Sequence, residues 1–285
     1  MSERLADVGR RIATVQQLGG VVNAMRGIAG ARAQQARTLL PAICAYADTA
    51  ARAIGQARRL ETEHSVPGHL QGGRSCLIVF GAGQGFAGAF PERVLDALTD
   101  ADRSSRIFLI GERSAAIATE RGFVIDWQSS QPHRAALLPA LATAIVDALY
   151  EALAEAGPVA VTMVYPVWTP ERSVAVLRRS LLPLDPHDFP SESGRTVPLV
   201  NLPAAVLIER LAQEYLFARL CEAATECFTA ENEARMMNMA AAKSNIDGKL
   251  AALQLEERLT RQDEITAEVV ELAASGQSRR RNGVA

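Results

Sequence analysis

AAVLIERLAQEYLFARLCEAATECFTAENEARMMNMAAAKSNIDGKLAALQLEERLTRQDEITAEVVELAAS, residues 204–275, contains no proline and a single glycine, Gly248. Almost nothing in this stretch therefore stops a helix, because proline and glycine are the two residues that disfavour helices most. Apolar residues recur along it at helical spacing, and they are Leu207, Leu211, Leu216, Leu220, Met236, Met239, Ile246, Leu250, Leu253, Ile265, Val269 and Leu272. The pattern predicts one very long C-terminal helix over residues 201–275.

The N-terminal residues 1–59 show a second helical pattern. One narrow apolar stripe runs along it at spacings of three and four, formed by Leu5, Val8, Ile12, Val15, Leu18, Val22, Met25 and Ala29. A stripe this narrow is typical of a coiled-coil seam. Pro41 is expected to kink or break the helix.

Four glycines stand inside the N-terminal pattern: Gly19, Gly20, Gly27 and Gly30. Each costs a helix about 0.8–1.0 kcal/mol relative to alanine. Two explanations are open at this point. Either a partner backbone packs very close to these positions, or the glycines allow the helix to bend locally.

Between the two helical ends the period of the sequence changes. Short apolar runs at residues 76–80, 106–110, 123–127, 159–165 and 173–182 predict strands, and helical patterns lie at 91–101, 112–121 and 134–156. Alternation of this kind predicts a mostly parallel sheet in an α/β domain over residues 74–190, with the fifth strand as an edge hairpin. Proline- and glycine-containing linkers flank it, at residues 60–75 and 185–203.

The lengths of the two helices decide the architecture. At 1.5 Å per residue they measure roughly 80 Å and 105 Å, too long to fit inside the small central domain. We therefore expect an α/β fold in which the N- and C-terminal helices form a long antiparallel coiled coil with a small foot domain at one end. The longer helix should leave residues near 259–275 as a single helix with exposed apolar side chains, which a sleeve from another protein would cover. Residues 276–285, which include three consecutive arginines, are expected to be a disordered tail.

Gly83-Gln84-Gly85-Phe86-Ala87-Gly88 is a formal G-x-G-x-x-G motif. Such a loop can hold the pyrophosphate of a dinucleotide, which would make the chain a nicotinamide dinucleotide-binding enzyme with helical oligomerisation arms. The motif begins three residues after the predicted strand, and Pro91 starts the next helix late, so a structural loop is favoured. The chain has two lysines, Lys243 and Lys249, and neither stands in a Walker motif.

Composition excludes several other classes of function. The formal net charge of −2 gives no basic field for nucleic acid. Neither the four cysteines nor the four histidines have metal-ligand spacing, so no metal or cofactor is expected. No continuous apolar run approaches 18 residues, and no direct membrane insertion is expected. The chain reads as cytosolic with reduced thiols.

Three regions of the sequence together resemble the gamma subunit of F-type ATP synthases. Near the N-terminus, Arg10-Arg11-Ile12 and Ala24-Met25-Arg26 resemble the family's RRI-x-x-V and A-M signatures. Residues 81–89 lie where the family has a glycine-rich S/T-x-x-x-G-L-x-G-G loop. Near the C-terminus, Ala234-Arg235-Met236 with Met239 resembles A-A-R-M-x-x-M, and Arg261-Gln262, Ile265-Thr266 and Glu268 match A-R-Q-x-x-I-T-x-E. The sequence departs from the family at residues 18–23 and at Glu257-Arg258, where the family has Tyr-Asn.

The resemblance implies a non-catalytic central-stalk rotor that couples ion flow through a membrane ring to ATP synthesis or hydrolysis. The implied partners are the alpha and beta subunits of the catalytic head, the epsilon subunit and the ring of c subunits. The implied location is the cytoplasmic face of the bacterial inner membrane. The residues that the family's motifs assign to partner binding are Met25, Arg26, Arg261, Gln262 and Thr266. Besides the dinucleotide-binding enzyme, a self-associating coiled-coil scaffold stays open as an alternative.

Overall fold

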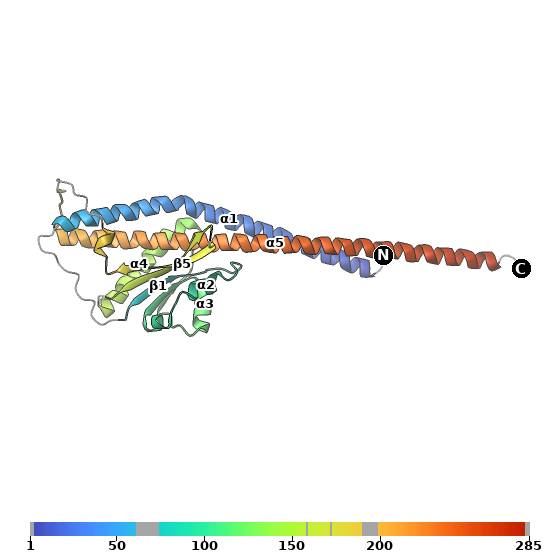
Figure 1. Cartoon of the computed structure of the whole chain (residues 1–285), viewed down its shortest axis with the longest axis horizontal. Helices are drawn as coiled ribbons and strands as arrows, with labels where there is room; N and C mark the ends of the chain where they lie inside the picture. Colours follow the sequence, from blue (N-terminus) through green and yellow to red (C-terminus); the bar gives the residue numbers. More distant parts are fainter. Residues whose placement is uncertain (1–2, 61–73, 158, 172, 190–198, 283–285) are drawn as a thin grey trace. The chain divides into compact units, whose positions relative to one another are not determined.

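A computed structural model describes residues 3–60, 74–157, 159–171, 173–189 and 199–282. The chain divides into two compact units, one of residues 28–236 and one of residues 1–27 together with 237–285. The long helices α1 (Glu3–Ala57) and α5 (Ala204–Asn282) each contribute to both units (Figure 1). The remaining parts of the expected linkers, at 61–73 and 190–198, and residues 283–285 lie outside the described residues.

The unit of residues 28–236 is built on a five-stranded sheet in the order β3-β2-β1-β4-β5. Its strands are β1 (Cys76–Phe80), β2 (Arg106–Ile110), β3 (Trp127–Ser129), β4 (Val161–Thr169) and β5 (Ser173–Leu182). The first four strands are parallel, and β5 pairs antiparallel with β4 at the edge of the sheet. The expectation of a mostly parallel sheet with an edge hairpin is confirmed.

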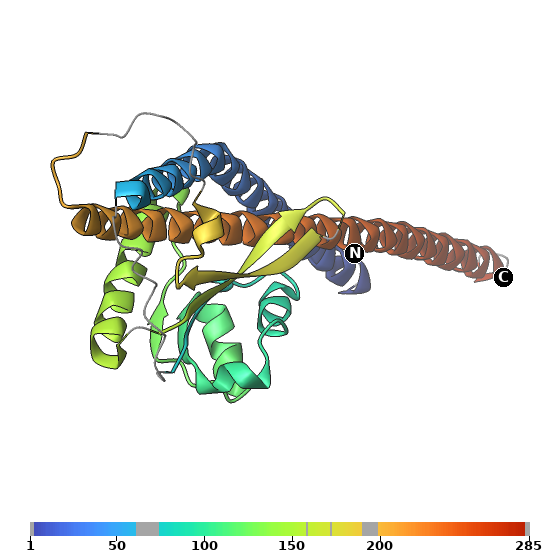
Figure 2. The same ribbon diagram turned by 60° about the vertical axis from the view of Figure 1, so that its left-hand side comes forward.

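Helices cover both faces of this sheet. The short helices α2 (Phe90–Leu95) and α3 (Glu112–Glu120) lie on the face turned away from α5 (Figure 2). On the other face, α5 adds buried residues to the sheet's core, among them Leu216, Leu220, Ala223, Ala224, Cys227, Phe228 and Ala230. All five residues of β1 are buried, as expected for a strand that is covered on both sides.

Helix α4 (Leu138–Ala156) follows a short 3-10 turn, η3 (Ala135–Leu137). The stretch from Ala135 to Glu155 is long and apolar enough to cross a membrane by length and composition alone, although polar residues interrupt it. One side of α4 belongs to the core of the sheet, where Leu138, Ile145 and Leu149 are buried. Its apolar composition is therefore accounted for in part by packing on the sheet.

Three elements of this unit differ from expectation. β4, expected at residues 159–165, spans Val161–Thr169. The strand expected at residues 123–127 is β3, which starts only at Trp127, because Phe123 turns into the core and Asp126 accepts a backbone hydrogen bond from β2. The helix expected at residues 91–101 ends at Leu95, and a separate 3-10 turn follows at Asp100–Ser104.

Both long helices are continuous, so of the two outcomes expected at Pro41, a kink or a break, the break does not occur. Pro41 lies inside α1 and does not end it. It removes one backbone hydrogen bond, but buried Ala36 and Ala47 on either side are held by packing. At the other end of the chain α5 continues to Asn282, so residues 276–282 are helical and not a disordered tail.

In the unit of residues 1–27 and 237–285, α1 and α5 run antiparallel. A Cβ added to Gly19 would lie 3.3 Å from Ile246, and Arg11 approaches Glu256 at 3.9 Å. Placing the two helix starts level would pair Leu18 with a residue near position 242. The observed register is displaced by about five residues, because side-chain packing sets it and not the positions of the helix ends.

Candidate partner-binding site

The loop at residues 81–89 joins β1 to α2 and carries the G-x-G-x-x-G motif. Two of its three motif glycines are explained by packing or backbone conformation, since a Cβ on Gly83 would lie 2.6 Å from the Cβ of Gln131 and Gly88 has a φ of +63°, whereas a Cβ on Gly85 would meet nothing within 4 Å. Phe86 also has a left-handed φ, +66°, which is uncommon for a bulky residue. It is 65% exposed. The loop thus presents an aromatic side chain to solvent.

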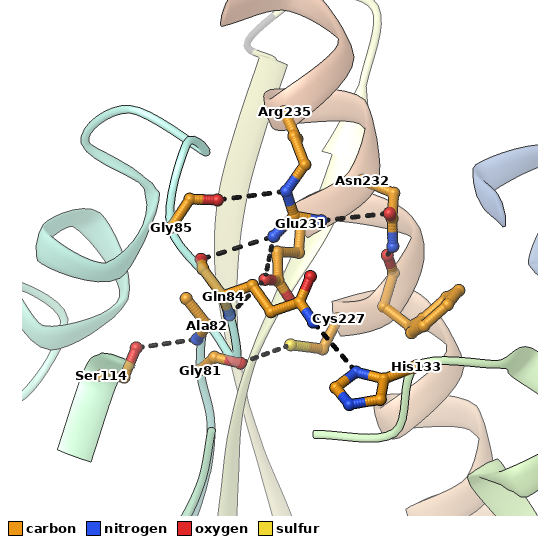
Figure 3. Close-up of polar contacts among 11 residues, drawn as sticks. Gly81, Ala82, Gln84, Gly85, Ser114, His133, Cys227, Glu231, Asn232 and Arg235 are labelled. Carbon is orange, nitrogen blue, oxygen red and sulfur yellow. Dashed lines mark hydrogen bonds and ion pairs between the residues drawn. The ribbon is translucent and has the colours of Figure 1, made fainter. Parts of the chain in front are cut away.

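Helix α5 holds this loop through a group of residues that we call the loop clamp: Gln84, Gly85, Glu231 and Arg235 (Figure 3). The backbone N–H of Gln84 donates to the carboxylate of Glu231 at 3.0 Å. The guanidinium of Arg235 donates to the carbonyl of Gly85 at 3.1 Å. Positive and negative groups of α5 therefore meet the acceptor and the donor that the loop backbone offers.

The centre of the loop clamp is a buried ion pair. Arg235 and Glu231 are 2.5 Å apart, and they are 5% and 3% exposed. Arg235 also donates to the amide oxygen of Asn232 at 3.1 Å, and the Asn232 amide donates to the carbonyl of Phe228 at 2.8 Å. Burial of two charges is tolerated when they are paired and hydrogen-bonded in this way.

Cys227 and Ser114 make further contacts with the same loop. Cys227 of α5 donates its thiol hydrogen to the carbonyl of Gly81 at 3.4 Å. Burial and, to a smaller extent, the neighbouring Glu231 carboxylate raise the pKa of this thiol well above its ordinary value, so the group stays protonated and able to donate. On the other side of the loop the backbone N–H of Ala82 donates to the hydroxyl of Ser114 at 2.8 Å.

This arrangement argues against a dinucleotide at the motif. In a Rossmann loop the backbone N–H groups face a pyrophosphate, but here the N–H of Gln84 already faces the Glu231 carboxylate. The helix that follows has no side-chain cap, and its first residues, Phe90 and Pro91, are buried. The space in front of the loop is occupied by α5.

Met25 and Arg26 lie on α1 in the unit of residues 1–27 and 237–285. Met25 is half-buried, and Arg26 is exposed. None of the ion pairs or hydrogen bonds among the described residues involves Arg26.

Arg261, Gln262 and Thr266 lie on α5 and are all exposed. Arg261 forms an ion pair with Glu257 at 2.8 Å, and its side chain is 59% exposed. The hydroxyl of Thr266 donates to the backbone carbonyl of Gln262 at 2.8 Å. These three residues share one short segment, whereas Met25 is level with a residue near 240 of α5, about 30 Å away along the axis. The five residues therefore form two groups.

Past Thr260, which is buried, the character of α5 changes. Because Arg11 is level with Glu256, the first described residue of α1, Glu3, is level with about residue 264. The following residues of α5 have no α1 residue beside them in the described chain. Their apolar side chains are exposed, as Ile265 (56%), Val269 (58%), Val270 (62%) and Leu272 (71%) show. We call residues 265–272 the apolar tip.

Sequence reasoning placed the apolar tip but missed the loop clamp. Glu231 and Arg235 stand four residues apart on a helix, a spacing that signals an ion pair. Nothing in the sequence says that this pair faces a loop about 150 residues earlier in the chain. Only packing of α5 on the sheet brings the two together.

Comparison with known proteins settles the family. A model of the family described as "ATP synthase" matches residues 4–278, which is nearly the whole chain. The chain belongs to the ATP synthase gamma-chain family. Similar gamma chains include those of Parafrankia sp. (strain EAN1pec), 26% identical over 95% of this chain and 96% of the relative, and of Renibacterium salmoninarum, 29% identical over 98% and 99%.

Solved structures agree with the gamma-chain fold. The chain resembles one from the Euglena gracilis mitochondrial ATP synthase, OSCP/F1/c-ring, with a TM-score of 0.66 at 12% identity, covering 99% of this chain and 96% of the other. It also resembles one from the Tetrahymena thermophila mitochondrial ATP synthase, central stalk/c-ring, with a TM-score of 0.53 at 18% identity, covering 78% and 99%. None of these similarities favours a dinucleotide-binding enzyme.

Proposed function

We propose that this gamma-family chain is the central-stalk rotor of an F-type ATP synthase, coupling ion flow through a membrane ring to ATP synthesis or hydrolysis in an alpha/beta head. The observation that carries the proposal is the apolar tip. An unpaired helix with a row of exposed valine, leucine and isoleucine side chains is poorly suited to water and well suited to an enclosing apolar sleeve. A head built from alternating alpha and beta subunits would supply that sleeve.

An asymmetric shaft inside a ring of similar sites explains how such a chain would act without catalysing a reaction. Each site would meet a different side of the shaft and would be biased toward a different affinity, so rotation would exchange the states of the sites. The chain itself would perform no chemistry, in keeping with a glycine-rich loop that is filled by its own helix.

Arg261, Gln262 and Thr266 would bind a loop of the beta subunit at the base of the apolar tip. The Arg261–Glu257 ion pair is solvent-exposed, and such pairs contribute only about 0–1 kcal/mol. Arg261 can therefore exchange Glu257 for a partner carboxylate and hold it in a bidentate hydrogen bond. Met25 and Arg26 would form a second contact with the head, roughly 30 Å along the shaft.

The sheet unit would be the foot of the rotor, in contact with the epsilon subunit and the ring of c subunits. In a bacterial host this places the chain at the cytoplasmic face of the inner membrane, bound through its partners. No part of the proposal requires the chain to bind nucleic acid, a metal or a cofactor.

The apolar tip gives a direct test. The triple variant Ile265→Ser, Val269→Ser and Leu272→Ser should leave the isolated chain as stable as the wild type, because these side chains are exposed. In a complex reconstituted with alpha and beta subunits, ATP hydrolysis and rotation should fall strongly. Val124→Ser, a change at a 70% exposed valine of the sheet unit, is the matched control.

Two results would contradict the proposal. One is a triple variant that assembles and turns over ATP at the wild-type rate. The other is a wild-type chain that forms stable oligomers by itself in analytical ultracentrifugation and does not bind alpha and beta subunits, which would favour a coiled-coil scaffold.

A further inference from the structure

The glycines of the long helices fall into two groups by what surrounds them. A Cβ on Gly19 would meet Ile246 at 3.3 Å, and one on Gly30 would meet the sulfur of Met236 at 3.2 Å, so packing accounts for both. A Cβ on Gly20 or Gly27 would meet nothing within 4 Å. Close approach within the chain therefore explains only half of this cluster, and Gly20 and Gly27 weaken the helix without any gain in packing.

The C-terminal helix has the same feature at the same level. A Cβ added to Gly248 of α5 would also meet nothing within 4 Å. Because Gly19 lies against Ile246, Gly20 and Gly248 are separated along the axis by only about 4–5 Å, less than one helical turn. Each helix of the pair thus has an open glycine within the same turn.

The residues around these two glycines are weak helix formers as well. Residues 19–23 of α1 read Gly-Gly-Val-Val-Asn, and residues 244–248 of α5 read Ser-Asn-Ile-Asp-Gly. None of the ten is one of the strong helix formers Ala, Leu, Arg, Met, Lys, Gln or Glu, although the chain is rich in alanine and arginine. Gly19 packs against Ile246, but Gly20 and Gly248 have open space beside them and Val21 is more than half exposed, so packing covers only part of the two segments.

We propose that residues 19–23 and 244–248 form a hinge in the coiled coil, a level at which both helices bend or open more readily than on either side. A weak segment in one helix alone would be stabilised by a strong helical segment beside it. Two weak segments side by side lack this stabilisation, so local opening of the helices is easiest here. The use of this hinge in rotation rests on the proposed function, whereas its existence does not.

Hydrogen exchange on the purified full-length chain tests the hinge. Backbone amides of residues 18–24 and 244–250 should exchange faster than those of residues 10–16 and 252–258. Gly20→Ala and Gly248→Ala should each slow exchange in the hinge by about fivefold, the equivalent of about 1 kcal/mol of helix propensity. Gly9→Ala also fills an open position and should leave the hinge amides unchanged. Gly19→Ala, whose Cβ is crowded by Ile246, should give less protection than Gly20→Ala.

The hinge is refuted if the two segments exchange no faster than their flanks, or if neither open-site alanine slows exchange. Gly20→Gln separates the hinge from a docking surface, since glutamine is a strong helix former with a large side chain. If the segments form a hinge, Gly20→Gln should slow amide exchange as much as Gly20→Ala does, and the variant should still assemble with alpha and beta subunits. Assembly lost with glutamine but kept with alanine would overturn the hinge in favour of a partner backbone against Gly20.

A role in rotation is tested separately in the assembled complex. The double variant Gly20→Ala with Gly248→Ala should narrow the angular fluctuations of a bead carried by the shaft, with subunit content unchanged. Unchanged fluctuations would refute that role. Failure of the wild-type chain to assemble at all would instead refute the proposed function, and the exchange experiment would be unaffected.

Discussion

Removal of one member of the buried ion pair in the loop clamp should destabilise the sheet unit strongly. Glu231→Gln or Arg235→Met leaves an opposite charge buried without its partner, because the two groups are 3% and 5% exposed. Breaking a buried pair from one side costs about 3–5 kcal/mol. With Arg235→Met the loss includes the hydrogen bond to the Gly85 carbonyl, worth about 0.5–1.5 kcal/mol. Glu231→Gln keeps an amide oxygen that can still accept from the Gln84 N–H.

Replacement of both charges should cost less than the sum of the single changes. In the double variant Glu231→Gln with Arg235→Met no unpaired charge is left, and the main remaining loss is the hydrogen bond from Arg235 to the Gly85 carbonyl. We expect the double variant to be no less stable than the worse single variant, with a coupling energy of about 2 kcal/mol or more. The exposed pair Asp7–Arg10 is the control, and Asp7→Ala should cost less than about 1 kcal/mol.

Urea unfolding followed by tryptophan fluorescence reports the stability of the sheet unit, in which the loop clamp lies. Both tryptophans of the chain, Trp127 and Trp168, lie in strands of the sheet. The reasoning is refuted if either single variant costs less than about 1 kcal/mol, or if the two single costs simply add.

Three further predictions concern other parts of the molecule. The pKa of Glu226 is raised by burial and by the neighbouring Glu222 carboxylate, so the folded chain loses stability as pH rises through that raised pKa and the side chain ionises. Glu226→Gln should therefore stabilise the chain near neutral pH but not in acid. A difference in unfolding free energy between variant and wild type that stays the same from pH 4 to pH 8 would contradict this. Gly83→Ala places a Cβ 2.6 Å from a buried side chain and should cost about 1–3 kcal/mol, while Gly85→Ala, with nothing within 4 Å, serves as its control in the same urea assay. Arg261→Ala should leave the subunit folded but weaken a desolvated contact in the complex by about 2–5 kcal/mol, so that ATP-driven ion pumping falls; wild-type pumping and hydrolysis, measured side by side with subunit content checked, would show that Arg261 has no such role.

Sequence patterns predicted most of the fold because its strands are short apolar runs between clear breaks. β1, β2 and β5 lie where the runs indicated. β3 was misplaced because Phe123, at the start of the apolar run, is buried in the core although it lies outside the strand. Pro41, which was expected to kink or break the helix, does not end α1, because residues on both sides of it are held by packing.

The candidate sites divide in the same way. Helix lengths alone indicated an overhanging apolar end, since that inference needs only the rise per residue. The register of α1 on α5 was about five residues off, because helical periodicity repeats every turn and does not say which turns meet. The loop clamp and the open or crowded state of each glycine depend on that register and on contacts between distant residues. No single-sequence pattern contains this information.

The loop clamp and the hinge place opposite mechanical demands on the same helix. A buried ion pair is seldom the most stabilising way to fill a core, since apolar residues of similar size often do better. What Glu231 and Arg235 add is geometry, because a planar guanidinium that meets a carbonyl, an amide oxygen and a carboxylate fixes the loop in one orientation on α5. At residues 244–248 the same helix consists of weak helix formers, and a Cβ on Gly248 would meet nothing within 4 Å. A rotor shaft needs a rigid connection to its foot to transmit torque, and it needs some compliance where it turns inside an asymmetric ring. α5 provides the rigid connection at the loop clamp and the compliance at residues 244–248.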